Sequence, residues 1–209
     1  MGITFIKEEV SVAPGQKSGA DIVLNLERYG RISHRSEGTG SLEDAGIFIK
    51  KLISWGHESV LEHESFTVKI TCSRAISHEI VRHRIGTAFT QESTRYCNYF
   101  NDIAFIEPDE VQPSETGSLK QSTIFRTACR QAWEAYMQLC EGNTVKPETA
   151  RDLLPNALAT TLYMTANIRE WRHVIKLRTS NAAHPAIRKL FKDVLNLLKA
   201  EIPFCFDDL

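Results

Sequence analysis

The sequence lacks any apolar run near the roughly 18 residues that a membrane-spanning helix requires. Its first nine residues contain no basic segment followed by an apolar stretch, so no signal peptide is expected. The 209 residues are 42% apolar and 24% charged, close to the average for globular proteins. We therefore expect a soluble cytoplasmic protein in which residues 1–209 form one domain with a hydrophobic core.

Cysteine is scarce and unpatterned. The five residues are odd in number and contain no Cys-x-x-Cys pair, which argues against a disulfide framework or a thiolate zinc site. Reduced thiols are expected, most of them small core residues, although a lone cysteine can also be a nucleophile. The positions are Cys72, Cys97, Cys129, Cys140 and Cys205.

The net charge is only −1, so the sequence lacks the electrostatic footprint of a general nucleic-acid-binding protein. It also lacks the Walker A and Gly-x-Gly-x-x-Gly loops that hold nucleoside triphosphates and dinucleotides. Eight of the 14 arginines nevertheless fall within residues 74–95 and 151–178. Because arginine presents a planar fork to phosphate or carboxylate, these two windows predict local anion sites.

Hydrophobic periodicity predicts helices and strands without a regular alternation, which is typical of an α+β fold. Alternating apolar residues predict a half-buried strand over 65–72. Ser73 can cap a helix to about Arg84, and Asn167 with Glu170 three residues later predicts a helix to Arg178. Other expected elements are helices at 42–55, 118–141 and 186–200, a short helix from Pro147, strands at 3–10 and 157–165, and a loop at 107–118.

The densest polar segment, residues 77–84, superficially resembles a zinc-binding His-Glu-x-x-His motif. His78 and His83 are five residues apart, so on a helix they diverge by about 140° and do not form a metal site. On the same helix, Glu79, Arg82 and His83 would share one face. That face predicts an anion site, with a solvated charged surface as the alternative.

Three other segments are dense in groups that bind anions. Residues 56–63 hold two histidines and two glutamates, and residues 85–96 are rich in hydroxyl, amide and guanidinium donors. Arg169, Arg172 and His173 lie at i, i+3 and i+4 on the helix expected from Asn167. Such density suggests a phosphate-bearing small molecule, although surface salt bridges would also explain the last group.

Several of these segments together resemble the flavin-dependent thymidylate synthase family. Arg82-His83-Arg84, a spacer and Ser93-Thr94-Arg95-Tyr96 match the family signature. The resemblance extends in the family's order over most of residues 31–205. It includes Arg31-Ile32-Ser33-His34, Gly56-His57-Glu58-Ser59-Val60-Leu61-Glu62-His63, Phe66 through Ala75, Ala150 through Pro155, Thr165 through Glu170, and Leu177-Arg178.

The resemblance implies an α+β fold with a central antiparallel-type sheet, assembled as a homotetramer with active sites between subunits. The implied reaction makes dTMP from dUMP and methylenetetrahydrofolate, with NADPH supplying reducing equivalents through FAD. No metal and no cysteine nucleophile is implied. In the family's reaction the flavin supplies hydride chemistry, and the protein supplies positioning and electrostatics.

The resemblance also assigns roles to residues. Arg178 would be catalytic at the uracil ring, and His57 would lie on the folate side of the flavin. FAD contacts would come from Ser59, Arg82, His83, Arg84, Gln91, Asn167, Ile168, Arg169 and His173. Nucleotide contacts would come from Glu79, Ile80, Val81, Arg82, Gln91, Glu92, Ser93, Thr94, Arg95, Arg151 and Arg178.

The sequence departs from the family pattern at three places. The spacer from Arg84 to Ser93 holds eight residues where the usual signature has seven, which shifts the alignment of Gln91 and Glu92 by one position. His173 stands where several relatives have Asn, and the run from Ala183 to Arg188 differs from the common one. Two alternatives remain: a non-catalytic nucleotide- or RNA-binding module that uses the same arginine clusters, and a flavoprotein relative without synthase activity, which the eight-residue spacer would favour.

Overall fold

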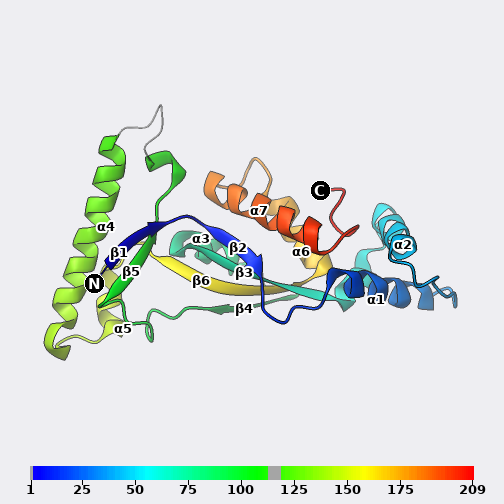
Figure 1. Ribbon diagram of the computed structural model, residues 1–209, viewed down its shortest axis with the longest axis horizontal. Helices are drawn as coiled ribbons and strands as arrows, with labels where there is room; N and C mark the ends of the chain where they lie inside the picture. The colour runs from blue at the N-terminus through cyan, green and yellow to red at the C-terminus, as the bar shows by residue number, and fades with distance from the viewer. Residues whose placement is uncertain (1, 113–118) are drawn as a thin grey trace. The chain divides into compact units, whose positions relative to one another are not determined.

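The computed structural model describes residues 2–112 and 119–209, and these residues form two compact units (Figure 1). The chain passes between the units several times. The first unit comprises Met1–Glu9, Thr71–Arg82 and Thr90–Leu162, and the second comprises Val10–Ile70, His83–Phe89 and Tyr163–Leu209.

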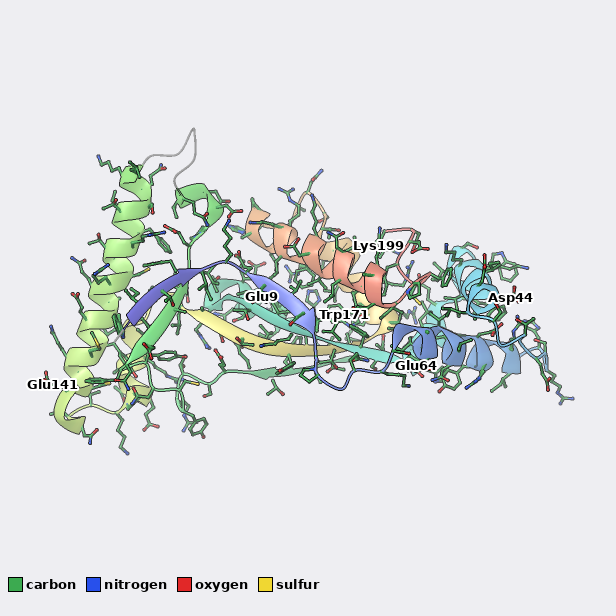
Figure 2. The ribbon with its side chains drawn as sticks, viewed as in Figure 1. Glu9, Asp44, Glu64, Glu141, Trp171 and Lys199 are labelled. Carbon is green, nitrogen blue, oxygen red and sulfur yellow. The ribbon has the colours of Figure 1, made fainter. Side chains whose placement is uncertain are left out.

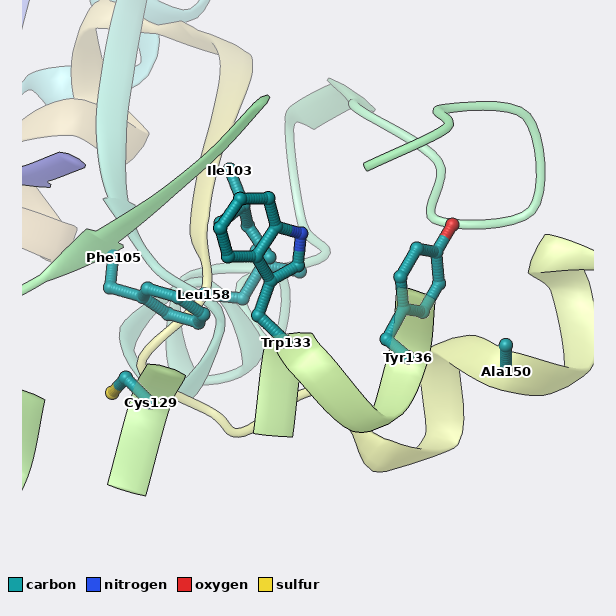
Figure 3. Packing of buried hydrophobic residues seen from close by; sticks show 7 residues of the cluster. All are labelled: Ile103, Phe105, Cys129, Trp133, Tyr136, Ala150 and Leu158. Carbon is teal, nitrogen blue, oxygen red and sulfur yellow. The ribbon is translucent and has the colours of Figure 1, made fainter. Parts of the chain in front are cut away.

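The first unit is built on a parallel pair of strands, β1 (Gly2–Ile6) and β5 (Asp102–Ile106), paired from Gly2 with Asp102 to Ile6 with Ile106. The long helix α4 (Leu119–Cys140) contributes Cys129, Trp133 and Tyr136 to a core that also contains Ile103 and Phe105 (Figure 3). The Trp133 indole nitrogen donates to the Tyr99 carbonyl at 2.7 Å, so the ring is buried in the core without leaving its N–H unpaired. The unit also contains η2 (Asp109–Val111), η3 (Glu141–Asn143), α5 (Pro147–Ala150) and η4 (Arg151–Leu153).

A four-stranded sheet has the order β2–β3–β6–β4. Hydroxyl pairs on its two long strands give their register: Thr67 meets Thr165, and Thr71 meets Thr161. The residue number rises on one strand as it falls on the other, so these strands are antiparallel and the expectation of an antiparallel sheet is confirmed. The strands are β2 (Glu9–Val12), β3 (Ser65–Ser73), β4 (Thr87–Gln91) and β6 (Ala159–Asn167).

The second unit is mainly helical. Helix α1 (Gly19–Ile32) packs on α2 (Leu42–Ser54), and α6 (Ile168–Arg178) packs on α7 (Pro185–Glu201) and on η1 (Glu58–His63). Trp171 of α6 is fully buried, and its indole donates to the Phe66 carbonyl at 2.9 Å (Figure 2). This bond ties α6 to strand β3 and fixes the orientation of the helix.

The helix after Ser73 is shorter than the sequence predicted. Helix α3 (Arg74–Ile80) begins with the expected cap, in which the Ser73 hydroxyl accepts from the Ile76 amide, but it ends at Ile80. Arg82 and His83 therefore do not continue a helical face with Glu79, and that prediction is wrong. Residues 81–86 form the connection from the helix to β4, whose first residue is Thr87.

Several other predicted helices and strands differ from the observed ones. Residues 3–10 are not one strand but parts of β1 and β2, which belong to different sheets. Helix α1 and strands β4 and β5 had no predicted counterpart. The expected helices at 42–55, 118–141 and 186–200 are confirmed within a residue or two. Of the expected 107–118 loop, residues 113–118 lie outside the described residues, and its first part contains the short helix η2.

All five cysteines are free thiols. Within residues 2–112 and 119–209, no cluster of three metal-ligating side chains is present. No helix of this same part of the chain combines the length and the apolar character needed to cross a bilayer.

Candidate functional site

A polar cleft of about 550 Å³ lies in the second unit at the start of α6. It contains three of the residues expected to bind flavin, namely Asn167, Arg169 and His173. Its lining residues are Glu58, Glu62, Ile85, Gly86, Asn167, Arg169, Glu170, His173 and Lys176.

The start of α6 is fixed by the cap that the sequence predicted. The Asn167 side chain accepts from the Glu170 amide at 2.8 Å, and the Asn167 amide donates to the Gly86 carbonyl at 3.2 Å. Gly86 has φ +64°, and a Cβ there would lie 2.6 Å from the Asn167 side-chain nitrogen. Glycine is therefore required for the 82–86 turn to approach the helix.

The charges in the cleft are mixed. Arg169 forms an ion pair with Glu62, and both side chains are about half exposed. His173 and Lys176 are exposed on the following turns of α6, while partial burial raises the pKa of Glu170. An incoming anion would thus find cations and a helix N-terminus, but it would compete with Glu62 for Arg169.

Ile168, expected to contact flavin, is not among the residues that line the cleft. Its side chain is fully buried, and its amide donates to the Glu64 carbonyl at 3.0 Å. Glu64 is held in turn by Lys17 and Asn25 (Figure 2). The residue therefore fixes the helix start and presents no side chain to a ligand.

His83 and Arg178 meet in the same unit. The Arg178 Nε donates to the Nε2 of His83 at 2.9 Å, and Thr87 donates to the His83 carbonyl. Burial first, and then the charge of Arg178, lower the pKa of His83 to about 4. The imidazole is thus neutral, with Nε2 as the acceptor and its proton on Nδ1.

In the first unit, two residues expected to contact ligands are engaged by the protein. Gln91 donates to the hydroxyls of Ser77 and Thr160, at 2.9 and 3.1 Å. The Glu92 carboxylate accepts from the Thr161 amide at 3.0 Å. Both interactions fix the end of β4 against β6, which gives these side chains a structural role.

The turn after β4 brings together the other nucleotide candidates. Ser93 accepts from the Arg95 amide at 3.3 Å, and the Arg95 guanidinium lies 5.6 Å from the centre of the Tyr96 ring. Thr94 is buried and accepts from Arg151 at 2.9 Å. Arg151, 57 residues further along the chain, is therefore positioned at this turn.

The remaining candidates differ in exposure. Ile80 is fully buried, and Glu79 and Val81 are half-buried at the end of α3. The exposed residues are His57, Ser59, Arg82 and Arg84. The His57 ring lies 5.8 Å from that of Trp55 at the start of η1.

Sequence reasoning misjudged Arg172. Helical spacing grouped it with Arg169 and His173, but Arg172 is 1% exposed and bonds to the C-terminal residues Cys205 and Asp208. Sequence reasoning also did not place Glu58, Glu62, Gly86 and Lys176 in the cleft, which they line. The density of charge in residues 56–63 was the available signal for the two glutamates.

The fold is shared with a solved nucleotide methylase. The structure matches that of the UMP/dUMP methylase PolB from Streptomyces cacaoi, solved bound with 5-Br UMP, with a TM-score of 0.77. The match covers 98% of this chain and 95% of the methylase at 22% sequence identity, which establishes a shared fold.

The sequence comparisons establish the family. The family model described as thymidylate synthase complementing protein matches residues 21–204, and the chain belongs to this family. The chain is 40% identical over 170 residues to the flavin-dependent thymidylate synthase of Geobacter sulfurreducens, covering 80% of this chain and 71% of that protein. It is 34% identical over 219 residues to the Mycolicibacterium gilvum protein of the same name, covering 97% and 86%.

Proposed function

We propose that this protein is a flavin-dependent thymidylate synthase, a methyltransferase that converts dUMP to dTMP. The family match over residues 21–204 carries the proposal. The cleft at the start of α6 supports it, because it combines Asn167, Arg169 and His173 as the family resemblance requires.

The residues of the cleft fit a flavin dinucleotide. The positive end of the α6 dipole with adjacent cations suits a pyrophosphate. Gly86 lets the 82–86 turn approach that end of the helix, beside Asn167. We infer that Arg169 and His173 hold the anionic part of FAD, and that Asn167 and the backbone of Ile168 fix the helix end beside it. The neutral His83, the exposed side chains of Ser59, Arg82 and Arg84, and Gln91 complete the proposed flavin-binding set.

A methylene group is two electrons more oxidised than the methyl group of dTMP, so the reaction requires a hydride, which reduced FAD supplies when bound. NADPH is the proposed reductant and methylenetetrahydrofolate the proposed one-carbon donor. His57, exposed beside Trp55, is proposed on the folate side. A homotetramer of single-domain chains in the cytoplasm, with active sites between subunits, is part of the same proposal.

The nucleotide is proposed to bind at the turn after β4. Arg95 and Arg151 supply positive charge there, and Ser93 and Thr94 supply hydroxyls. Glu79, Arg82 and the backbone of Ile80 and Val81 are the proposed contacts from the end of α3. Gln91 and Glu92 would act mainly by holding this turn on β6, as their hydrogen bonds indicate.

Arg178 is the proposed catalytic residue. Uracil C5 becomes nucleophilic when negative charge develops along the N3–C4–O4 edge of the ring, and a cation there stabilises that charge. Arginine suits this role because it remains charged at any working pH. The bond from Arg178 to neutral His83 fixes the orientation of the guanidinium without cancelling its charge.

Flavin absorbance and NADPH oxidation together test the proposed function. The purified protein should be yellow, and dUMP with methylenetetrahydrofolate should raise NADPH consumption. A colourless protein that binds nucleotides would indicate a binding module instead. A yellow protein whose NADPH consumption produces no dTMP would indicate a flavoprotein without synthase activity.

A further inference from the structure

The last seven residues, 203–209, form a tail that returns to α6 after α7 ends at Glu201. Cys205 and Phe206 of this tail are fully buried. Lys199 donates to the Leu209 carbonyl at 2.6 Å, and Lys50 pairs with Asp207 at 2.7 Å (Figure 2). The tail is therefore anchored to the second unit by buried Cys205 and Phe206 and by the side-chain bonds of Lys50 and Lys199, while Asp207 and Asp208 stay about half exposed.

Near its end, the tail binds the buried guanidinium of Arg172. Arg172 is 1% exposed, and it donates to both carboxylate oxygens of Asp208 at 2.7 Å and to the Cys205 carbonyl at 2.6 Å. This fork-to-fork geometry is the strongest form of a guanidinium–carboxylate interaction. It also holds the pKa of Asp208 below its usual value, mainly through the hydrogen bonds from Arg172.

The backbone of the tail is strained at one residue. Phe204 has φ +73°, a region that bulky side chains rarely adopt. Its ring fills the space over Gly46, where a Cβ would lie 2.4 Å from the ring, and Lys50 lies 5.1 Å from the ring centre. Such strain persists only where surrounding contacts determine the conformation, and here it directs the chain toward Arg172.

The third nitrogen of Arg172 bonds to a residue that lines the cleft. Its Nε donates to the Glu58 carboxylate at 3.4 Å, and Glu58 lines the cleft at the start of α6. Glu58 also begins η1 and lies between His57 and Ser59, the proposed folate-side and flavin contacts. One buried side chain thus connects the C-terminal tail to the segment of residues 57–63.

We propose that the tail acts as a clasp, in which Asp208 positions Glu58, and with it residues 57–63, through the buried guanidinium of Arg172. Two carboxylates share one cation. When Asp208 loses its charge, the Arg172 guanidinium is no longer held in place, and its single hydrogen bond from Nε to Glu58 is weakened. Asp208 and Arg172 are positioning residues that touch no ligand, and their effect on flavin binding depends on the function proposed above.

Hydrogen exchange in the flavin-free protein tests the clasp without relying on that function. Asp208→Asn should speed exchange of the amides in residues 58–63 about tenfold. Asp207→Asn, which breaks only the exposed pair with Lys50, should not. Exchange that quickens in the tail but stays unchanged in residues 58–63 would show a local anchor and would overturn the proposal.

A double-mutant cycle on flavin affinity supplies the second test, at temperatures where every variant remains folded. Asp208→Asn and Glu58→Gln should each weaken flavin binding about tenfold, and their combination should be no worse than either alone. Asp208→Glu should restore most of the affinity. Additive losses would overturn the clasp.

If Asp208→Asn fails to fold, hydrogen exchange of residues 58–63 is compared in Asp208→Glu, Glu58→Gln and wild type instead. A wild-type protein that binds no flavin would refute the proposed function but leave the exchange result decisive.

Discussion

The side chain of Arg178 donates from Nε to Nε2 of His83 at 2.9 Å, although the two residues are 95 positions apart in the sequence. The bond joins the C-terminal end of α6 to the turn that carries the family signature. It requires a neutral imidazole, and burial together with the nearby Arg178 charge lowers the pKa of His83 to about 4. His83 therefore orients the proposed catalytic cation and also belongs to the proposed flavin-binding set.

The low pKa of His83 predicts a pH-dependent stability. In the unfolded chain the imidazole titrates near 6.5, whereas in the folded protein it titrates near 4. The unfolded state therefore binds more protons between these values, so the stabilisation is complete above about pH 6.5 and is lost as the pH falls toward 4. Thermal unfolding of the flavin-free protein at pH 7.5 and pH 5 should show a smaller decrease for His83→Gln than for wild type. Equal decreases would contradict the neutral assignment.

Arg178→Ala should retain flavin but lose turnover. Asn167 and Arg178 are eleven helical positions apart, or about 16 Å at 1.5 Å per residue, so Arg178 lies far from the proposed flavin contacts at the start of α6, and it adjoins the proposed set only at His83. Loss of one charge-stabilising group typically costs about 10²–10³ in rate. Arg178→Lys should recover only part, because an ammonium lacks the planar two-donor edge. Steady-state rates, corrected for the flavin occupancy measured by absorbance, test this prediction. Normal turnover by Arg178→Ala would show that Arg178 has no catalytic role and serves only as a cation at the end of α6.

Arg169→Ala should lose flavin first. Its guanidinium lies in the cleft and is about half exposed, so it can exchange Glu62 for an anionic ligand. Hydrogen bonds to charged groups contribute about 1.5–3 kcal/mol, which corresponds to roughly a tenfold to hundredfold weaker flavin affinity. Fluorescence titration of FAD measures the change. Arg130→Ala, on the exposed face of α4, is the matched control, and equal effects of the two substitutions would remove Arg169 from the site.

Each Cys→Ser variant should keep most of its turnover. Burial raises the pKa of Cys72 and Cys205 to about 12 and that of Cys129 to about 11, so none of these three forms a thiolate nucleophile at neutral pH. Cys97 and Cys140 are only partly buried and provide the sharper test. Activity assays on folded, flavin-loaded variants check the prediction. A single inactive variant would point to covalent catalysis by that cysteine.

Local sequence signals predicted the parts of the structure that depend on neighbouring residues. The Asn167 cap with Glu170 three residues later predicted the start of α6, and alternating apolar residues predicted β3. The strand expected at 157–165 is β6, shifted by two residues. Helix α1 had a comparable signal, since Ser18 caps it and Asp21 lies in its first turn, but the signal was overlooked.

Contacts between distant residues were beyond such reasoning. Helix α3 ends at Ile80 because the chain turns at Gly86 to meet Asn167, a contact that helix propensity does not encode. Arg172 has the helical spacing of a cleft residue, yet a tail 36 positions away buries it. The positions of the arginines could be read from the sequence, whereas which of them face a ligand required the folded chain.

The most direct test of the central claim is the identity of the product made from dUMP. Purified protein should be incubated with dUMP, methylenetetrahydrofolate and NADPH, and the nucleotides analysed by liquid chromatography and mass spectrometry. The account predicts dTMP, formed only when both dUMP and the folate are present and greatly reduced in Arg178→Ala. Retention of dUMP by a folded, flavin-loaded wild-type protein would contradict it.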